Sequence, residues 1–411
     1  MQRCILHADC NCFYASVEML HRPETRQVPM AVGGSEERRH GIILAKNDLA
    51  KQYGVTTAEP LWEARRKCPE LVIVPPNFPL YHEFSSRVKQ IFSYYTDQIE
   101  SFGIDEAWLD VTGSTALFGS GTQIAQEIRT RVKRELGITV SVGVSWNKVF
   151  AKLGSDLKKP DAVTEILPDN YRTAVWPLPV GALLFVGHAT EKKLAELGIH
   201  TIGQLAQVPC DFLRAKLGKS GELLWAYANG LDCSPVSYHD EHAPVKSISN
   251  STTTFRDITS PEDARLVFTV LAESVAARLR EQGLYCRTIS VSTRSTALKQ
   301  AEHQCTLSRP TDATRTIFQT SVSLFDQGYD WKLPLRSLGI QLSGLTPVSD
   351  PVQLDLFTDP QAAHRQSQLD RTVDRVRRRF GNDSVMRASV LRDPALTGIH
   401  TNRELQPAGI H

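Results

Sequence analysis

The chain has 411 residues, too many for one ordinary domain, so we expect three or four domains. Hydrophobic residues make up 41% and charged residues 22% of the sequence, which is typical of a soluble globular protein. The net charge is only +2, so any contact with nucleic acid must come from local basic patches rather than from an overall field.

The N-terminal sequence reaches a carboxylate, Asp9, too early for a signal peptide, and no apolar run is long enough to span a bilayer. The eight cysteines are scattered and form no CxxC pair, which indicates reduced thiols. We therefore expect a cytoplasmic protein with no membrane segment.

A short buried strand over residues 5–8 ends at Asp9, and residues 11–18 follow as a turn and a helix. A carboxylate at the end of a core strand, beside a helix N-terminus, is well placed to hold a cation near anionic phosphates. The alternative is that Asp9 only caps the helix. Metal ligation is favoured because Asp105 and Glu106, further along the chain, could converge with Asp9.

The sequence changes character between residues 28 and 76. A strand runs into the flexible pair Gly33 and Gly34, a partner strand covers residues 41–45, and a helix over residues 46–55 is closed by Gly54. Lys46 and Lys51 lie close to the strand end and could face a bound anion, although solvated helix lysines are the usual alternative.

An amphipathic helix over residues 78–98 leads into the stretch 101–110, which holds Asp105 and Glu106 between apolar flanks typical of a buried strand. Two charges there would be costly unless their desolvation is offset. A divalent cation would offset it, because Asp and Glu are natural ligands of magnesium and calcium. The alternative, a tight turn with solvated carboxylates, stays open on this stretch alone.

Two further helices flank another strand. Residues 122–136 form the first helix, residues 139–145 alternate like a strand, and residues 147–159 form a basic helix stopped by Pro160. Strand and helix pairs on both sides of the carboxylates indicate a mixed sheet with helices packed on one face.

Short helices occupy residues 177–230. Within them, residues 185–199 have the outline of a helix-hairpin-helix, in which a glycine turn lets backbone N–H groups approach a DNA phosphate. Only Gly187 remains in that turn, so a plain helical turn is the alternative. A polar segment over residues 232–245 indicates a linker between domains.

Residues 246–345 mix strands and helices and predict a small α+β domain. The tail then carries Gln353, Leu354, Asp355, Leu356 and Phe357, whose apolar side chains have no helix or strand to bury them. They indicate an exposed linear motif, and a fragment packed on the preceding domain is the alternative. A helix rich in arginine follows over residues 368–380, and from about Asp393 we expect no structure.

Three ordered blocks, residues 9–18, 104–107 and 145–160, closely resemble the Y-family (DinB/UmuC-type) translesion DNA polymerases. The resemblance covers about residues 3–345. It implies an α/β and α+β multidomain fold, a right hand with a mixed-sheet palm, small fingers, a helical thumb and an α+β little finger. The implied bounds are palm 1–27 and 78–168, fingers 28–77, thumb 169–233, linker 234–246, little finger 247–347 and tail 348–411.

The resemblance also assigns roles to residues. Asp9, Asp105 and Glu106 match the catalytic, metal-binding carboxylates of the family, and the backbone carbonyl of Cys10 would be a further metal ligand. The implied cofactor is Mg²⁺, as two ions. Two cations bridged by carboxylates fit phosphoryl transfer, because one activates the primer 3′-hydroxyl and the other stabilises the leaving pyrophosphate.

The incoming nucleotide, a dNTP, would be held by residues of the same blocks. Tyr14, next to Phe13, matches the steric gate, an aromatic ring under the sugar that excludes a 2′-hydroxyl. Lys51 and Lys159 match positions that grip the triphosphate, where fixed positive charge offsets the charge of the transition state.

The sequence departs from the DinB pattern at three places. Asn11 stands where DinB-type enzymes carry a second aspartate, as it does in UmuC-type proteins. Asp48 stands where a tyrosine touches the triphosphate, so that contact is not carried over. The thumb turn around Gly187 lacks the usual second glycine. These features indicate a mixed DinB/UmuC-like subgroup.

Binding of primer–template DNA would be mostly to phosphates, through the thumb at Gly187 and through the little finger, where Arg336 is a candidate template contact. A surface arginine without that role is the alternative. Residues 353–357 match the peptide that binds the bacterial sliding clamp (its beta subunit), with Leu356 and Phe357 as buried anchors.

The sequence thus predicts a DNA-directed DNA polymerase that acts as a monomer on the clamp and copies damaged or undamaged template. One alternative is a catalytically inactive Y-family relative that links the clamp to another polymerase, but such a protein should have lost palm carboxylates. Another is a palm-like nucleotidyl cyclase, which would need no thumb, little finger or clamp peptide.

Overall fold

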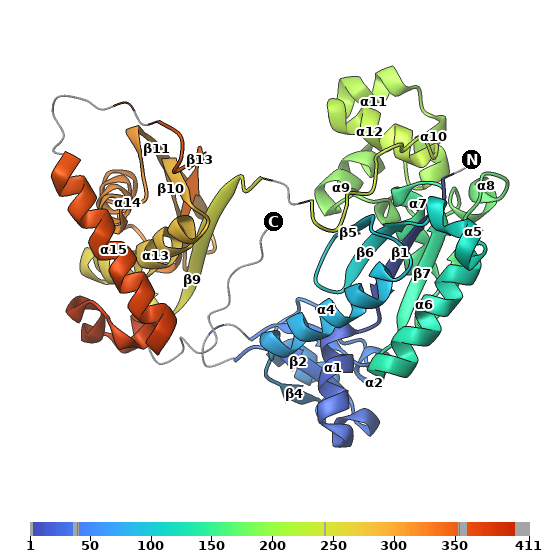
Figure 1. Cartoon of the computed structure of the whole chain (residues 1–411), viewed down its shortest axis with the longest axis horizontal. Coiled ribbons are helices and arrows are strands. Elements are labelled where there is room, and N and C mark those ends of the chain that lie inside the picture. Colours follow the sequence, from blue (N-terminus) through green and yellow to red (C-terminus); the bar gives the residue numbers. More distant parts are fainter. Residues whose placement is uncertain are drawn as a thin grey trace. The chain divides into compact units, whose positions relative to one another are not determined.

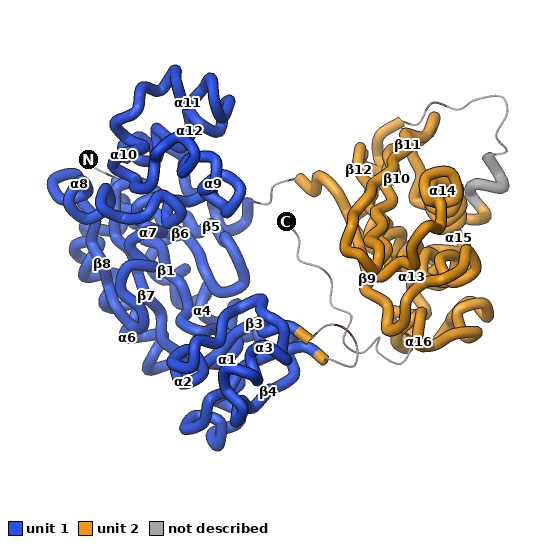
Figure 2. Tube along the Cα trace, turned by 180° about the vertical axis from the view of Figure 1, so that it is seen from behind, with its two compact units in different colours: residues 1–34, 42–242 blue, residues 35–41, 243–411 orange. Residues whose placement is uncertain are grey.

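The computed structural model describes residues 3–35, 39, 41–241, 244–351, 353 and 360–398. The chain divides into two compact units (Figure 2). Unit 1 comprises Met1–Gly34 and Ile42–His242, and unit 2 comprises Ser35–Gly41 and Ala243–His411. Within the described ranges no helix is long and apolar enough to cross a membrane.

Unit 1 is built on a mixed sheet of five strands in the order β5-β6-β1-β7-β8 (Figure 1). The central strand β1 runs antiparallel to both β6 and β7, while β7 and β8 are parallel. The strands are β1 (Ile5–Cys10), β5 (Ile99–Ser101), β6 (Glu106–Asp110), β7 (Val140–Ser145) and β8 (Val163–Glu165).

Helices cover both faces of this sheet, so the expectation of helices on one face is wrong. Leu6 and Ala8 of β1 share a core with helices of one face, whereas Ile5 packs with Ala151 of α7 on the other. Both sets are apolar, so both faces need a cover. The helices concerned are α1 (Phe13–His21), α4 (Phe78–Ser93) and α6 (Gly121–Leu136) on the first face and α7 (Lys148–Leu157) on the second.

Contact between α7 and β7 is unusually close. A Cβ atom added at Gly143 would lie 1.8 Å from the carbonyl oxygen of Ala151, and one added at Gly154 would lie 3.1 Å from the Cα of Gly143. Only glycine fits at Gly143 without moving the helix. The close approach positions Lys152 on α7 and the residues that follow it.

A second, three-stranded sheet has the order β3-β2-β4 and lies beside the helices α2 and α3. The helix expected over residues 46–55 is shorter, because Asn47 caps its N-terminus by accepting a hydrogen bond from the Ala50 N–H at 2.9 Å. The elements are β2 (Met30–Gly33), β3 (Ile43–Lys46), β4 (Val72–Val74), α2 (Asp48–Gln52) and α3 (Leu61–Lys67).

Short helices complete unit 1, and they were expected over residues 177–230. They are α5 (Thr115–Phe118), α8 (Tyr171–Ala174), α9 (His188–Glu196), α10 (Ile202–Gln207), α11 (Cys210–Leu217) and α12 (Lys219–Ala228). The described 3₁₀ helices of the whole chain are Pro23–Gln27, Thr112–Ser114, Val180–Ala182, Asn382–Ser384 and Ala388–Arg392.

The first part of the expected linker 234–246 packs on unit 1. Val236 is only 2% exposed and joins a cluster with Ile5 and Trp108. The backbone N–H of Ser237 donates to Glu100 Oε2 at 3.1 Å, and that of His239 donates to the Asp97 carbonyl at 3.0 Å. The linker is therefore shorter than the range 234–246 predicted from the polar composition of the segment.

Unit 2 holds an antiparallel sheet in the order β11-β10-β12-β9, with β13 paired to β10. Two helices share its hydrophobic core, as the prediction of an α+β domain over residues 246–345 requires. The elements are β9 (Ser247–Ile258), β10 (Leu284–Ser295), β11 (Gln300–Thr311), β12 (Leu335–Ser343), β13 (Thr346–Pro347), α13 (Pro261–Glu281) and α14 (Thr314–Gly328).

The arginine-rich helix of the tail, α15 (Pro360–Phe380), begins earlier than predicted and packs against α13. The Arg280 side chain of α13 is 5% exposed and lies 2.6 Å from Asp374 and 3.6 Å from Asp370. The helix is thus an integral part of unit 2.

The expectation of no structure from Asp393 is wrong for the residues that follow it directly. A short helix, α16 (Pro394–Thr397), is capped by the Asp393 carboxylate, which accepts from the Leu396 N–H at 3.0 Å. Leu396 is 3% exposed and lies in the core of unit 2. Leu396 thereby packs this turn against the core of unit 2.

Candidate active site

Three carboxylates predicted from distant parts of the sequence meet at one end of the five-stranded sheet. Asp9 on β1 is the direct antiparallel partner of Glu106 on β6. Asp105 precedes Glu106, and its carbonyl accepts a hydrogen bond from the Cys10 N–H at 3.0 Å. The pairing of β1 with β6 therefore brings together Asp9, Asp105 and Glu106.

For residues 101–110 the sequence left two interpretations open, a buried strand and a tight turn, and each is partly right. Residues 102–105 form the turn between β5 and β6, and Glu106 is the first residue of β6. Helix α4 braces the turn, because Ser85 Oγ donates to the Ile104 carbonyl and Lys89 Nζ donates to the Gly103 carbonyl at 3.4 Å. The carboxylates are not freely solvated, since the Glu106 side chain is only 18% exposed.

Two lysines from the basic segment neutralise part of this charge. Lys152 Nζ lies 2.5 Å from Glu106 Oε2 and 4.0 Å from Asp9 Oδ2. Lys159 Nζ lies 2.9 Å from Asp9 Oδ2. Lys159 was predicted from the sequence, whereas the only signal for Lys152 was its place in the same basic helix.

Burial and nearby charges shift the pKa values of the three carboxylates in different directions. Burial, together with the charges of Asp9 and Glu106, raises the pKa of Asp105 to about 6. Burial also raises the pKa of Asp9, although Lys159 opposes the shift. At Glu106 burial acts in the same direction, but the Lys152 ammonium outweighs it through its hydrogen bond and its charge and lowers the pKa to about 2.

His7, a residue that sequence analysis missed, lies behind Glu106 and is fully buried. Its Nδ1 is 2.8 Å from Ser155 Oγ, and the Ser155 hydroxyl donates to the Lys152 carbonyl at 2.7 Å. The Ser155 proton is thereby used, so Nδ1–H is the donor to Ser155. Nε2 then faces Glu106 Oε2 at 3.4 Å.

The donor set suits a hard divalent cation. Three partly buried carboxylates with mutual repulsion match the oxygen ligands that magnesium prefers. Among the described residues no group of three or more His, Cys, Asp or Glu side chains is gathered closely enough to hold an ion as it stands. Lys152 and Lys159 instead contact the carboxylate oxygens, and ligation of an ion would replace these contacts. The Cys10 side chain is buried, so that residue could contribute only its carbonyl.

The aromatic pair at the start of α1 has two different environments. Tyr14 is half-buried, and its ring stacks on that of Tyr81 with centroids 4.3 Å apart. Phe13 is 3% exposed and belongs to the core, with its ring 5.7 Å from that of Tyr14. Its side chain therefore packs beside Tyr14 in the core, and the place of Phe13 in the nucleotide site stays a prediction.

Basic side chains converge on the start of α1. Burial raises the pKa of the Cys12 thiol and Asp48 raises it further, while Lys46, Lys51 and Lys159 act to lower it. All of these side chains therefore lie within electrostatic range of Cys12. The two predicted triphosphate residues, Lys51 and Lys159, are both within that range, and Asp48 offsets part of their charge. Their role at a triphosphate stays a prediction.

Asn11, which departs from the DinB pattern, joins three segments. Its Nδ2 donates to Ser141 Oγ at 2.9 Å. Its Oδ1 accepts from Thr139 Oγ1 at 3.0 Å and from the Asp161 N–H at 2.9 Å. The side chain is 6% exposed and acts within the fold rather than toward a ligand.

The predicted DNA contacts lie in both units. Gly187 precedes α9 with φ of −82°, and no atom of the described residues lies within 4 Å of a Cβ built on it, so glycine is not required there by geometry. Phe185 instead takes the left-handed conformation, with φ of 67°, and is 59% exposed. In unit 2, Arg336 lies on β12 and is half-buried. Both DNA contacts stay predictions.

Of the clamp-binding peptide, Leu354, Asp355, Leu356 and Phe357 lie outside the described residues. Its assignment also stays a prediction.

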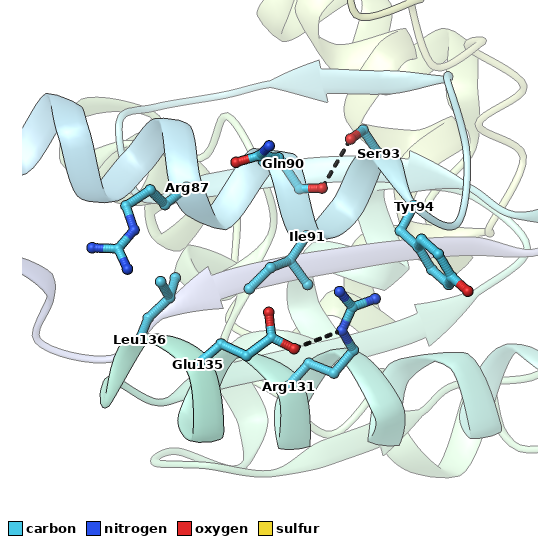
Figure 3. A pocket seen from close by; sticks show the side chains of 8 residues that line it. All are labelled: Arg87, Gln90, Ile91, Ser93, Tyr94, Arg131, Glu135 and Leu136. Atoms are coloured by element: carbon cyan, nitrogen blue, oxygen red, sulfur yellow. Dashed lines mark hydrogen bonds and ion pairs between the residues drawn. The ribbon is translucent and has the colours of Figure 1, made fainter.

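A separate cleft of about 640 Å³ lies between α4 and α6 (Figure 3). Arg131 and Glu135 form an ion pair at 3.0 Å on its wall, and Figure 3 shows Tyr94 beside Arg131. None of the predicted site residues lines it. The lining residues are Arg87, Gln90, Ile91, Ser93, Tyr94, Arg131, Glu135 and Leu136.

Three family models match the chain in the expected order. The impB/mucB/samB family matches residues 8–156, the DNA polymerase-iota thumb domain matches residues 184–232, and the impB/mucB/samB family C-terminal domain matches residues 245–356. Tail helix α15 lies beyond all three matches.

Curated relatives match over nearly the whole chain. A protein of Acetivibrio thermocellus named DNA polymerase IV is 51% identical, and the match covers 97% of this chain and all of the relative. A protein of Clostridium acetobutylicum with the same name is 39% identical over 95% of this chain and 99% of the relative. DNA polymerase IV 2 of Bacillus subtilis is 37% identical over 95% of each chain.

A solved Y-family DNA polymerase chimera has the same fold, with a TM-score of 0.74 over 84% of this chain and 99% of its own at 23% identity. The right-hand architecture is thereby confirmed. The relatives and the family models go further than the fold and favour the DinB side of the mixed subgroup inferred from the sequence. The chain belongs to the impB/mucB/samB family and is a DinB-type member of the Y-family DNA polymerases.

Proposed function

We propose that Asp9, Asp105 and Glu106 form the catalytic centre of this DNA-directed DNA polymerase of the translesion type. The observation that carries the proposal is the register of β1 and β6, which pairs Asp9 with Glu106 and brings Asp105 beside them. The alternative of an inactive bridging protein has no support in the comparisons. A site with all three carboxylates in place also argues against it.

Divalent metal, which we propose to be two Mg²⁺ ions, would be held by these carboxylates and by the Cys10 carbonyl. When bound, it supplies a lowered pKa for the primer 3′-hydroxyl and neutralises charge on the triphosphate and the leaving pyrophosphate. Metal ligation by Asp9 would replace its contact with Lys159, which could then hold the triphosphate together with Lys51. Tyr14 lies under the sugar of the incoming dNTP and excludes a 2′-hydroxyl.

The domain roles follow from the elements. We assign the palm to residues 1–27 and 78–168, the fingers to 28–77, the thumb to 169–233 and the little finger to 247–347. The Y-family architecture and the separate sheets support these bounds. The linker is restricted to the residues after His239, since the preceding ones pack on unit 1.

Contacts with DNA are proposed at the thumb turn around Gly187 and at Arg336, mostly to phosphates. Residues 353–357 are proposed to bind the bacterial sliding clamp, with Leu356 and Phe357 as anchors. We also propose that the enzyme works as a monomer in the cytoplasm, where its DNA substrate lies in a bacterial cell.

The test is primer extension on undamaged and abasic templates with Mg²⁺, comparing the native protein with Asp105→Ala plus Glu106→Ala. Extension by the native protein should be lost in the double variant and on chelation of the metal. Glu165→Ala, which removes an exposed carboxylate of β8, is the matched control and should extend normally.

Equal extension by the native protein and the double variant would reject this site. Lack of extension by either, with tight primer–template binding, would favour the bridging alternative. Repeating the assay with loaded clamp would then reveal an activity that depends on the partner.

A further inference from the structure

A second tyrosine lies directly against the proposed steric gate. The rings of Tyr14 on α1 and Tyr81 on α4 are stacked, with centroids 4.3 Å apart and planes only 16° apart. Tyr81 is fully buried, whereas Tyr14 is half-buried. One face of the gate ring is thus covered by Tyr81, and the gate's position depends on how firmly Tyr81 is held.

A buried carboxylate holds Tyr81 at its far end. The Tyr81 hydroxyl donates to Glu18 Oε1 at 2.7 Å, and Glu18 is 2% exposed. The other Glu18 oxygen lies 3.4 Å from Arg22 Nε. A glutamate this deeply buried is rare unless its oxygens are paired, and here both are.

The arrangement forms a closed loop of contacts between two helices. Tyr14 and Glu18 are four residues apart on α1, so they share one face of the helix. Tyr81 contacts both, with its ring against Tyr14 and its hydroxyl against Glu18. Phe78 adds an edge contact to each tyrosine, with centroids 5.8 Å from Tyr14 and 5.6 Å from Tyr81. Two points therefore fix the plane of the Tyr81 ring.

We propose that Tyr81, anchored by Glu18, is a positioning residue that holds the ring of Tyr14 in place and thereby sets how strictly the enzyme rejects ribonucleotides. The inference rests on the proposed role of Tyr14 as the steric gate. A ribonucleotide differs from a deoxyribonucleotide by one oxygen atom, so a small tilt of the gate ring is enough to admit it. Selectivity of this kind requires a side chain held to within about 0.5 Å.

The experiment measures kcat/KM for a ribonucleotide and for the matching deoxyribonucleotide on one primer–template. The ratio is the value for the ribonucleotide divided by that for the deoxyribonucleotide. Tyr14→Ala is the reference and should raise the ratio most. Tyr81→Leu removes the stacked ring and should raise the ratio about tenfold. Glu18→Leu keeps both rings but removes the anchor, and it should raise the ratio about threefold. Tyr81→Phe keeps the stacked ring and should restore most of the selectivity lost in Tyr81→Leu.

Tyr95→Leu is the matched control. Tyr95 is also a buried tyrosine that follows α4, but its hydroxyl is 3.4 Å from Arg131 and its ring contacts Tyr94 and Phe118, away from the gate. Its loss should lower stability without changing the ratio. Because both substrates are compared on the same preparation, partly unfolded protein cancels from the ratio.

Different results would reject the two proposals separately. No change in Tyr14→Ala would reject the gate itself. A large change in Tyr14→Ala, with none in Tyr81→Leu and none in Glu18→Leu, would reject the positioning role and leave the gate intact. A rise in Tyr95→Leu equal to that in Tyr81→Leu would also reject it, since any loss of a buried tyrosine would then suffice.

Discussion

Asn11 shows that a departure from a family pattern does not by itself reveal what a residue does. The sequence marks it only as a departure from the aspartate of DinB-type enzymes. In the structure both ends of its amide are used, by Ser141 on one side and by Thr139 and the Asp161 N–H on the other. These partners come from distant segments, so their identity depends on the tertiary fold.

Asn11→Ala should lower the free energy of unfolding by about 2 kcal/mol, because it leaves the Asp161 N–H and a buried hydroxyl without their partner. Urea unfolding measures the change. Asn11→Asp keeps two acceptor oxygens, and the hydroxyls of Thr139 and Ser141 can both donate to it, so more stability should be retained. Equal losses in the two variants would contradict the structural role.

This dependence on partners from distant segments also explains which site residues could be predicted from the sequence. Asp9, Asp105 and Glu106 could be identified because carboxylates at the ends of apolar strands are unusual. His7 and Tyr81 could not be identified, because each resembles an ordinary core residue until its partner is known. Glu106 and Glu18, the partners that give them a role, come from other segments.

At the scale of elements, the contact between α7 and β7 decides whether the site exists. The sequence predicts both elements, but it does not show that Gly143 lies against the backbone of α7. The sequence likewise predicts a buried strand over residues 5–8, but it does not show that α7 covers the second face of β1, where Ile5 packs with Ala151. Periodicity identifies elements, whereas the distances between them depend on side-chain volume.

Gly143→Ala should be destabilising by about 3 kcal/mol, because the new methyl group would overlap the Ala151 carbonyl and push α7 away. Primer extension should fall as well, since α7 carries Lys152 and leads to Lys159. Thermal unfolding and primer extension on one preparation measure both effects. Gly113→Ala is the control, because no atom lies within 4 Å of its Cβ, and it should change neither. An active, fully stable Gly143→Ala protein would show that α7 can shift without cost.

On the scale of the whole molecule, each unit buries its own core. The large clusters around Leu6 and around Phe268 share no residue, and the first lies in unit 1 while the second lies in unit 2. A chain built this way is expected to unfold in more than one step. The tail adds to unit 2, because Arg280 ties α15 to α13 through Asp370 and Asp374.

Arg280→Ala should therefore destabilise unit 2 alone. Removing one partner of a buried ion pair costs about 3–5 kcal/mol, since Asp370 and Asp374 would keep their charge without Arg280. Calorimetry should show one transition at lower temperature and the other unchanged. Arg265→Ala breaks an exposed pair with Asp326 and should cost less than about 1 kcal/mol. If both transitions moved together in Arg280→Ala, the units would be one cooperative body; if neither moved, the buried pair would contribute no net stability to α15.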